Sequence, residues 1–159
     1  MAKVHRVWSL TSQRFLELQI NTSNTDLAEV KSSKKEGEGN LGKITFRTGT
    51  RSPKKSYHLV FEEATNDRNY SLEIDDDDEL SVKGWNKDTP PNPPLEFQPH
   101  SKNSEPFTCL IALKPSWTEK TATENSFLLA SSSDGKLSLR PYHPLDEHHP
   151  DELFLLTYV

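Results

Sequence analysis

The chain consists largely of short stretches in which apolar and polar residues alternate. Apolar residues rarely recur at the i, i+3, i+4 and i+7 spacing of an amphipathic helix, and clusters of Gly, Pro, Asn, Asp and Ser separate the alternating runs. This pattern is typical of an all-β protein. It predicts twelve strands, at Val4–Leu10, Arg14–Ile20, Asp26–Lys31, Lys43–Arg47, Ser56–Glu62, Asn69–Asp75, Glu79–Lys83, Pro94–Gln98, Phe107–Leu113, Ser126–Ser131, Lys136–Arg140 and Glu152–Tyr158.

The twelve predicted strands form three similar groups of four, with a period of slightly more than about 50 residues. Each group opens with a strand and continues with a hairpin that begins at an aromatic residue: Phe15, Tyr70 or Phe127. Each closes on a strand that carries a phenylalanine: Phe46, Phe97 or Phe154. Any all-β chain of this length can be divided into thirds, but here three features recur in the same order, which favours a true repeat.

Three units of four strands describe a β-trefoil, in which six strands close a short barrel and three hairpins cap one end. Closure of the barrel removes the exposed strand edges that promote aggregation. The turns suit the hairpins, because Asp134-Gly135 accepts positive φ and Asp75 to Asp78 occupy the corresponding turn of the second unit. We therefore expect residues 1–159 to form a single all-β domain with β-trefoil architecture.

Composition sets limits on the function. The chain has 159 residues, of which 32% are hydrophobic, so one domain with a thin core and long polar loops is expected. The single cysteine, Cys109, excludes an internal disulfide and a zinc site built from cysteines. A net charge of -5 with no stripe of Lys and Arg argues against general nucleic-acid binding. No apolar run approaches the roughly 20 residues of a membrane helix, so membrane insertion is not expected.

Two segments resemble the interleukin-1 family. The N-terminal run His5-Arg6-Val7-Trp8-Ser9-Leu10, with Phe15 nine residues after Arg6, resembles the opening strands of its interleukin-36 and interleukin-1 receptor antagonist branch. Phe107-Thr108 and Pro115-Ser116-Trp117, followed by Leu128-Leu129-Ala130-Ser131, are similar to the family signature. The chain departs from that signature by an insertion over Thr118–Ser126 and by Ser131 in place of the usual Thr. The family fold is a twelve-stranded β-trefoil, which agrees with the strand pattern.

The resemblance implies a small leaderless cytokine without enzymatic activity, metal or cofactor. Such a protein binds an immunoglobulin-like receptor of the interleukin-1 receptor family as a monomer, and an agonist then recruits a second receptor chain to trigger inflammatory signalling, which an antagonist blocks. The resemblance further implies residence in the cytoplasm before unconventional export. Met1 to Leu10 contains no apolar stretch of signal-peptide length, which suits both this export route and a protein that remains in the cytosol.

The connection between the fourth and fifth predicted strands is basic and reads Gly-Thr-Arg-Ser-Pro-Lys-Lys from Gly49 to Lys55. From the residues alone it is an exposed loop. In the family this loop helps to determine receptor pairing. The resemblance therefore assigns receptor contacts here to Arg51, Ser52, Lys54 and Lys55.

The connection between the last two predicted strands, Pro141 to Pro150, is rich in histidine and acidic residues. Imidazoles and carboxylates can bind zinc, but three prolines and the absence of a regular period indicate a polar loop. Its histidines, which titrate near pH 6.5, could make it a pH-sensitive contact. The family resemblance makes it an interface candidate and not a metal site. The candidate receptor contacts are Tyr142, His143, Asp146, Glu147 and His148.

Asp75 to Glu79 is a run of five acidic residues, which offers oxygen ligands for calcium but lacks the spacing and glycine of a calcium loop. We expect a solvated hairpin turn, with an electrostatic contact to a basic receptor patch as the alternative.

Trp8 and Trp117 are expected in the core. Trp85 precedes a proline-rich loop and is the candidate for a partly exposed receptor contact. Cys109 is expected to be buried.

Catalytic motifs are not evident in the sequence, which contains neither a glycine-rich phosphate loop nor Gly-x-Ser-x-Gly nor His-Glu-x-x-His. Other trefoil classes fit less well. Repeated Gln-x-Trp of ricin-type lectins is absent, the basic patch of heparin-binding growth factors is missing, and Kunitz-type disulfides cannot form. The alternative that stays open is a non-cytokine trefoil binding or scaffold module acting in the cytosol, and an enzyme is the third possibility.

Overall fold

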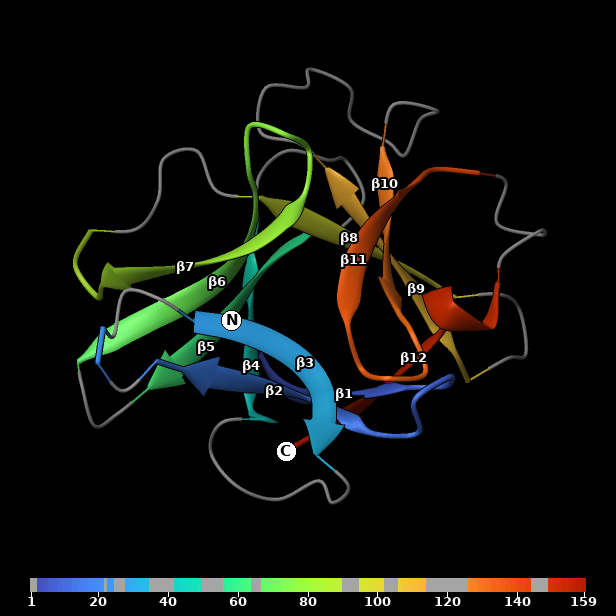
Figure 1. Ribbon diagram of the computed structural model, residues 1–159, viewed down its shortest axis with the longest axis horizontal. Coiled ribbons are helices and arrows are strands. Elements are labelled where there is room, and N and C mark those ends of the chain that lie inside the picture. Colours follow the sequence, from blue (N-terminus) through green and yellow to red (C-terminus); the bar gives the residue numbers. More distant parts are fainter. Residues whose placement is uncertain are drawn as a thin grey trace.

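The computed structural model describes residues 3–21, 23–24, 28–34, 42–49, 56–63, 67–89, 95–101, 106–113, 126–143 and 149–159. Over these residues the chain is almost entirely β-structure (Figure 1). The strands are β1 (Lys3–Ser9), β2 (Phe15–Ile20), β3 (Ala28–Lys34), β4 (Ile44–Thr48), β5 (Tyr57–Glu63), β6 (Arg68–Ile74), β7 (Leu80–Asn86), β8 (Glu96–Ser101), β9 (Thr108–Leu113), β10 (Phe127–Ser131), β11 (Leu137–Pro141) and β12 (Phe154–Tyr158). The predicted all-β class and the twelve predicted strands are confirmed.

Six of these strands close into a barrel. Strand β1 pairs with β4, β4 with β5, β5 with β8, β8 with β9, β9 with β12, and β12 returns to β1, each pair antiparallel. The first and last strands of the chain are therefore neighbours, with Val7 opposite Leu156. Because the ring is closed, none of its six strands presents a free edge, as expected for a β-trefoil barrel.

The other six strands form three hairpins, β2–β3, β6–β7 and β10–β11, arranged around the centre of the view in Figure 1. Each hairpin repeats one cross-strand pair of apolar residues. The three pairs are Leu18 with Val30, Leu72 with Val82, and Leu129 with Leu139. The leucine of the first strand is at most 1% exposed in every hairpin. The threefold repeat predicted from the sequence is thus present in both topology and side-chain pairing.

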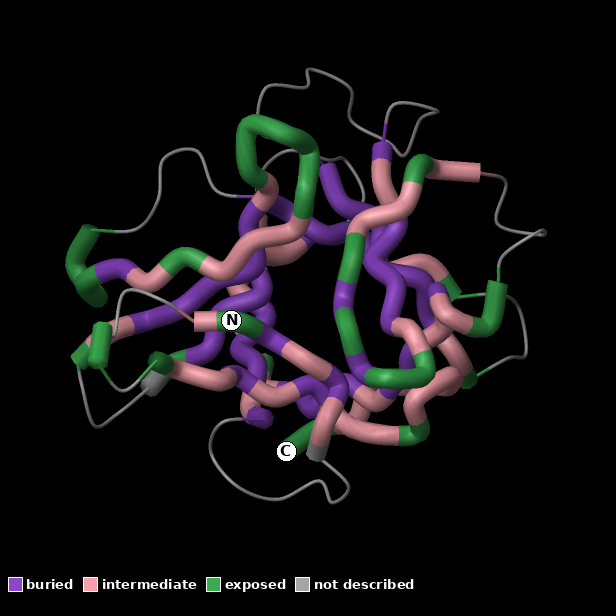
Figure 2. Tube along the Cα trace, in the orientation of Figure 1, coloured by how far each residue is buried: buried purple, intermediate pink, exposed green. Residues whose placement is uncertain are grey.

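The core runs through the barrel and beneath the cap. In each unit the phenylalanine of the closing strand lies opposite the strand that opens the unit, as Lys3 with Phe46, Tyr57 with Phe97, and Thr108 with Phe154. All three phenylalanines are at most 2% exposed. Removal of each aromatic ring from water stabilises the folded state by on the order of 2 kcal/mol. Figure 2 shows buried residues along the barrel strands and exposed residues in the hairpin turns.

The hairpin turns have the geometry that their residues predict. Gly135 has φ +90° in the β10–β11 turn, and a side chain there would place its Cβ 2.5 Å from the carbonyl oxygen of Ser32. In the β6–β7 turn Asp78 adopts φ +61°, a region that Asp tolerates better than most residues. Its N–H donates to the Asp75 carbonyl at 3.1 Å. The turns predicted at Asp134-Gly135 and at Asp75 to Asp78 are confirmed.

Two expectations about single residues have different outcomes. Cys109 in β9 is 1% exposed, which confirms its predicted burial. Trp8 in β1 is only partly buried, so its expected core position is wrong. Successive side chains of a strand point to opposite faces, and Val7 points into the core. Trp8 therefore lies on the other face, against Phe107, with ring centroids 6.5 Å apart. Trp117 lies outside the described residues.

The start of the last strand also differs from prediction. A strand from Glu152 was expected, but a short 3-10 helix, η3 (Pro150–Glu152), comes first and β12 begins at Phe154. Pro150 lies at the first helical position, where its missing N–H costs no hydrogen bond. A helix of the length and apolarity needed to cross a bilayer is not found among the described residues.

Candidate functional site

Seven of the ten candidate receptor-binding residues lie outside the described residues: Arg51, Ser52, Lys54, Lys55, Asp146, Glu147 and His148. The structure does describe both ends of the connections that contain them. At the β4–β5 connection the Gly49 N–H donates to the Ser56 carbonyl at 2.8 Å. The Ser56 hydroxyl in turn donates to the buried carboxylate of Glu96 at 2.5 Å. These contacts hold the two ends of the basic connection together.

A buried carboxylate anchors the β11–β12 connection. Glu152 in η3 is 2% exposed, and its Oε1 lies 2.7 Å from Nε2 of His143 and accepts the N–H of His149 at 3.0 Å. His143 follows β11, and His149 precedes η3, so one carboxylate contacts both ends of the connection. The Tyr142 N–H adds a bond to the Ser126 carbonyl at 2.9 Å.

An ion pair and a hydroxyl bond extend this anchor to the β1–β2 turn. The Arg140 guanidinium donates to Asp151 Oδ2 at 2.7 Å, and Thr11 donates to Asp151 Oδ1 at 2.6 Å. The hydrogen bond from Thr11 holds the pKa of Asp151 below its usual range, and Arg140 acts in the same direction against the effect of partial burial. We call Thr11, Arg140, His143, Asp151 and Glu152 the anchor cluster.

The anchor cluster is built for positioning. Its carboxylates are engaged by a guanidinium, a hydroxyl, an imidazole and a main-chain N–H, which leaves a network fixed at both ends. Among the residues that the structure describes, no three His, Cys, Asp or Glu side chains converge as metal ligands would. The cluster therefore holds the described ends of the connection, His143 and His149, near the β1–β2 turn.

Trp85 is not the surface residue that its sequence position suggests. Its side chain in β7 is 7% exposed, and its indole N–H donates to the Ser71 hydroxyl at 3.2 Å. The Arg47 guanidinium lies over the ring at 5.6 Å from the centroid. The expectation that Trp85 is partly exposed is thus wrong, because neighbouring strands supply both a polar partner and a cover for the ring.

Beneath Trp85 lies a buried polar row on β6. Ser71 donates to Glu73 Oε2 at 2.7 Å, and Glu73 Oε1 accepts the N–H of Leu95 at 3.1 Å. Burial raises the pKa of Glu73 above its ordinary value, although both of these bonds and the charge of Lys83 oppose that shift. The row links β6 to the residue just before β8, which makes it a structural tie within the second unit.

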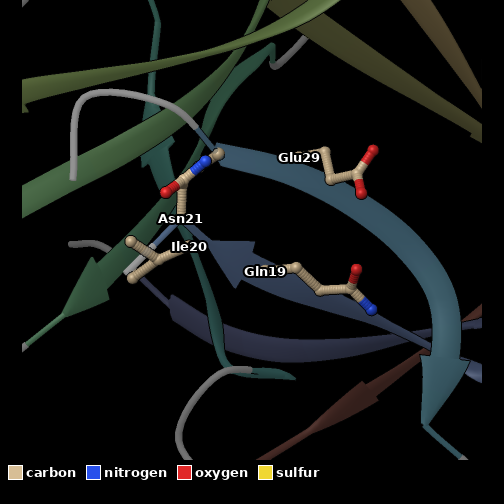
Figure 3. Close-up of a pocket in the computed structure, with 5 residues that line it drawn as sticks. Gln19, Ile20, Asn21 and Glu29 are labelled. Atoms are coloured by element: carbon tan, nitrogen blue, oxygen red, sulfur yellow. The ribbon is translucent and has the colours of Figure 1, made fainter. Parts of the chain in front are cut away.

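Two polar pockets border the β2–β3 hairpin. One, of about 390 Å³, lies at the end of the hairpin and is lined by Gln19, Ile20, Asn21, Ala28 and Glu29. Figure 3 shows Gln19 on β2 and Glu29 on β3, which are cross-strand partners. The other, of about 330 Å³, lies between hairpins and is lined by Arg14, Ser32, Ser33, Ser133 and Asp134. Both offer hydrogen-bonding groups together with apolar surface.

The sequence analysis missed the role of Glu152 and Arg140. Glu152 was placed at the start of a strand, where alternation would leave its charge in solvent. The run Pro150-Asp151-Glu152 carried a signal, since proline followed by acidic residues is typical of the first turn of a helix. The side-chain partner of Glu152, His143, lies nine residues earlier, after β11, and only the tertiary structure brings the two groups together.

Comparisons with known proteins bear on the fold. No protein-family model matches the chain, and no curated protein matches it. A solved structure, described as "BEL beta-trefoil apo crystal form 3", superposes with a TM-score of 0.58 over 99% of this chain and 93% of the other, at 16% sequence identity. The chain has the β-trefoil fold. At this level of identity the likeness extends to the fold alone, and membership of the interleukin-1 family stays a prediction.

Proposed function

We propose that the protein is a small β-trefoil cytokine of the interleukin-1 type, which binds an immunoglobulin-like receptor ectodomain and acts without chemistry of its own. One observation carries the proposal. The two segments that resemble the family meet in the fold, where the Trp8 ring stacks on Phe107 with 6.5 Å between centroids and 23° between planes. Trp8 also pairs with Phe15, the residue whose spacing forms part of the resemblance.

The second resembling segment supports the same proposal. Leu128, Leu129 and Ala130 in β10 are fully buried, as the apolar part of a family signature should be if its role is to build the trefoil. Signature residues of this kind maintain the scaffold. Receptor specificity then falls to the connections between strands, which differ in sequence and lie on the surface.

The connection between β11 and β12 is the part of this surface that the described residues best define. Its two ends are held by Glu152, and the adjacent turn is held by Asp151 through Thr11. Residues that are held in place before binding, as these ends are, lose less conformational entropy when a partner docks. Tyr142 and His143 are partly buried at its first end and remain receptor-contact candidates in this proposal, as do the residues of the basic β4–β5 connection.

The decisive experiment is surface binding of the purified protein to the ectodomains of interleukin-1-family receptors, singly and with the second chain added. Binding to one primary receptor is the expected result. A further rise with the second chain identifies an agonist, and no rise identifies an antagonist. The variant Arg51→Ala/Lys54→Ala/Lys55→Ala should weaken binding at least tenfold, whereas Asp67→Asn/Asp88→Asn on the second hairpin should leave it unchanged.

Absence of binding to every receptor in the panel would reject the cytokine proposal. The trefoil would then be better explained as a binding or scaffold module of the cytosol. Fractionation of producing cells and medium separates the two: a cytokine of this type is found in the cytoplasm and, after stimulation, in the medium, whereas a scaffold stays inside cells.

A further inference from the structure

The three hairpins of the cap do not close on one another equally. The first and third are joined through the main chain, where the Ser32 N–H donates to the Gly135 carbonyl at 3.0 Å and Lys31 bridges to Lys136. Their serines also meet, with Ser32 Oγ 2.6 Å from Ser131 Oγ. Between the second and third hairpins, a cleft of about 230 Å³ remains between the start of β7 and β11. We call it the cap cleft.

The cap cleft has an apolar floor. Leu80 of β7 and Leu139 of β11 are partly buried and pack on the main core, and Leu137 is 8% exposed. Where the first and third hairpins meet, a main-chain hydrogen bond joins Ser32 to Gly135, and the adjacent pocket is lined by polar side chains. In the cap cleft leucine side chains from two units line a concave surface that solvent reaches. Such a surface gains free energy when another apolar group covers it.

The rim of the cap cleft is strongly acidic. Asp78 and Glu79 line it, and they belong to the run Asp75–Glu79, whose five carboxyl-bearing residues are all exposed. Lys136 stands on the opposite wall. Asp78 and Glu79 at the cleft, with three further acidic residues in the same exposed turn and one ammonium opposite, give the mouth a negative potential, which attracts cationic groups and repels anionic ones.

The acidic turn is held in position by its first residue. Oδ1 of Asp75 accepts the N–H of Asp77 and the N–H of Glu79, both at 2.9 Å, and the main chain of Asp75 and Glu79 pairs at 2.9 Å. The rim is consequently ordered in the free protein. A partner that binds there does not have to order the turn, which lowers the entropic cost of docking.

The volume of the cap cleft and the chemistry of its lining together indicate what kind of group it binds. Pockets for drug-sized ligands usually measure about 300–1,000 Å³, and the cap cleft is smaller, so it suits a side chain of a peptide. The leucine floor favours an aliphatic side chain, and the rim favours Arg or Lys on either side of it. We propose that the cap cleft docks a basic segment of a protein partner, with an aliphatic side chain between Leu80 and Leu139 and cationic side chains beside Asp75–Glu79.

This docking site goes beyond the proposed cytokine activity. It uses none of the ten candidate receptor contacts, and it assigns the Asp75–Glu79 turn, the alternative electrostatic contact, to a basic partner segment, so it holds equally for a cytokine and for a cytosolic scaffold. Failure of the receptor panel and failure of the docking experiment are therefore separate results.

The test uses the full-length, isotope-labelled protein and three synthetic peptides at low salt. The probe is Arg-Arg-Leu-Leu-Arg-Arg, and the controls are Glu-Glu-Leu-Leu-Glu-Glu and Arg-Arg-Ser-Ser-Arg-Arg, all with blocked ends. We expect the probe to shift the backbone amide signals of Leu80 and 137–139 and to bind about tenfold more tightly than the serine control. The acidic control should not bind, and added salt should weaken the probe.

Two matched double variants test the rim. Asp77→Asn/Glu79→Gln removes two charges at the cleft and should weaken the probe about 4- to 20-fold, because each exposed charge pair is worth a modest factor. Asp67→Asn/Asp88→Asn removes the same charge at exposed positions remote from the turn and should change affinity less than about twofold. Lys136→Glu should raise the affinity for the probe about twofold or more.

The proposal is overturned by any of three outcomes. Equal affinity for the serine control would show a purely electrostatic attraction with no use of the leucine floor. Shifts that fall outside Leu80 and 137–139, or a complete lack of shifts at millimolar peptide, would show that the cleft does not bind. Equal loss of affinity in the two double variants would show that the probe responds only to the net charge of the protein.

Discussion

The imidazole Nε2 of His143 lies 2.7 Å from Oε1 of Glu152, and the Glu152 carboxylate is 2% exposed. The same oxygen accepts the His149 N–H at 3.0 Å. One buried carboxylate thus joins the residues that follow β11 to those that precede β12. The two described ends of the connection between the last two strands are held together by this carboxylate.

Glu152→Gln should destabilise the protein. The substitution keeps the shape of the side chain but removes the negative charge that His143 and Arg140 face, and it leaves a buried network partly unsatisfied. We expect the free energy of unfolding to fall by about 1–3 kcal/mol in urea denaturation at pH 7. The exposed Glu79→Gln serves as control and should stay within about 0.5 kcal/mol of the parent. Equal stability of the two variants would contradict the anchoring role of Glu152.

His5 should make stability depend on pH. The ring is 8% exposed and lies between Phe46 and Tyr158, with centroids 4.5 and 4.6 Å away. Burial lowers the pKa of His5, and the charge of Lys3 acts in the same direction against a main-chain hydrogen bond. Below pH 6.5 the unfolded chain therefore takes up a proton before the folded protein does, and stability falls as the pH falls.

His5→Phe removes this proton uptake, so the free energy of unfolding of the variant should depend less on pH. The measurement is the free energy of unfolding of parent and variant between pH 5 and pH 7.5, with the parent losing stability relative to His5→Phe on acidification. Comparison of the two proteins cancels the effect of Glu73, whose raised pKa has the opposite sign and favours the folded state as the pH falls toward 4.5. Parallel curves for the two proteins would show that His5 does not titrate differently on folding.

Gly135→Ala should disrupt the joint between the first and third hairpins. The new Cβ would lie 2.5 Å from the Ser32 carbonyl oxygen, and φ +90° strains any residue with a side chain. We expect a loss of about 2–4 kcal/mol in thermal or urea unfolding. At Gly42 the nearest atom is the end of the flexible Arg6 side chain at 3.1 Å. Gly42→Ala should therefore cost much less, and equal losses would argue against a tight joint at Ser32.

Trp85→Phe should lower stability without changing partner binding. The variant loses the indole hydrogen bond to Ser71 and part of the ring that Arg47 covers, so a loss of about 1–2 kcal/mol is expected in urea. Receptor or peptide affinity per folded molecule should match the parent. A selective loss of affinity with unchanged stability would restore Trp85 as a surface contact.

The strand pattern was open to prediction because it is local. Alternation with period two identifies a strand from its own residues, and three phenylalanines at matching places identify the repeat. Phe46, Phe97 and Phe154 accordingly lie where the sequence indicated, at most 2% exposed. The same rule failed for Trp8, because alternation tells which residues share a face but not which face meets the core.

The candidate site was less accessible to such reasoning. Trp85 was taken for a surface residue from its proline-rich neighbourhood, whereas Ser71 on the adjacent strand β6 and Arg47 on β4 determine its environment. Seven of the ten candidate contacts lie outside the described residues and stay predictions. The receptor itself is likewise a prediction, supported by the contact between Trp8 and Phe107.

By itself, the sequence determined the all-β class, the twelve strands, the threefold repeat and the turns at Asp75–Asp78 and Asp134-Gly135, because each follows from the spacing of neighbouring residues. Tertiary structure alone decided the joint between Ser32 and Gly135, the anchor at Glu152 and the cap cleft between β7 and β11. Each of these joins groups from different elements of the fold. Their distances depend on how the barrel closes, and barrel closure is a property of the whole chain.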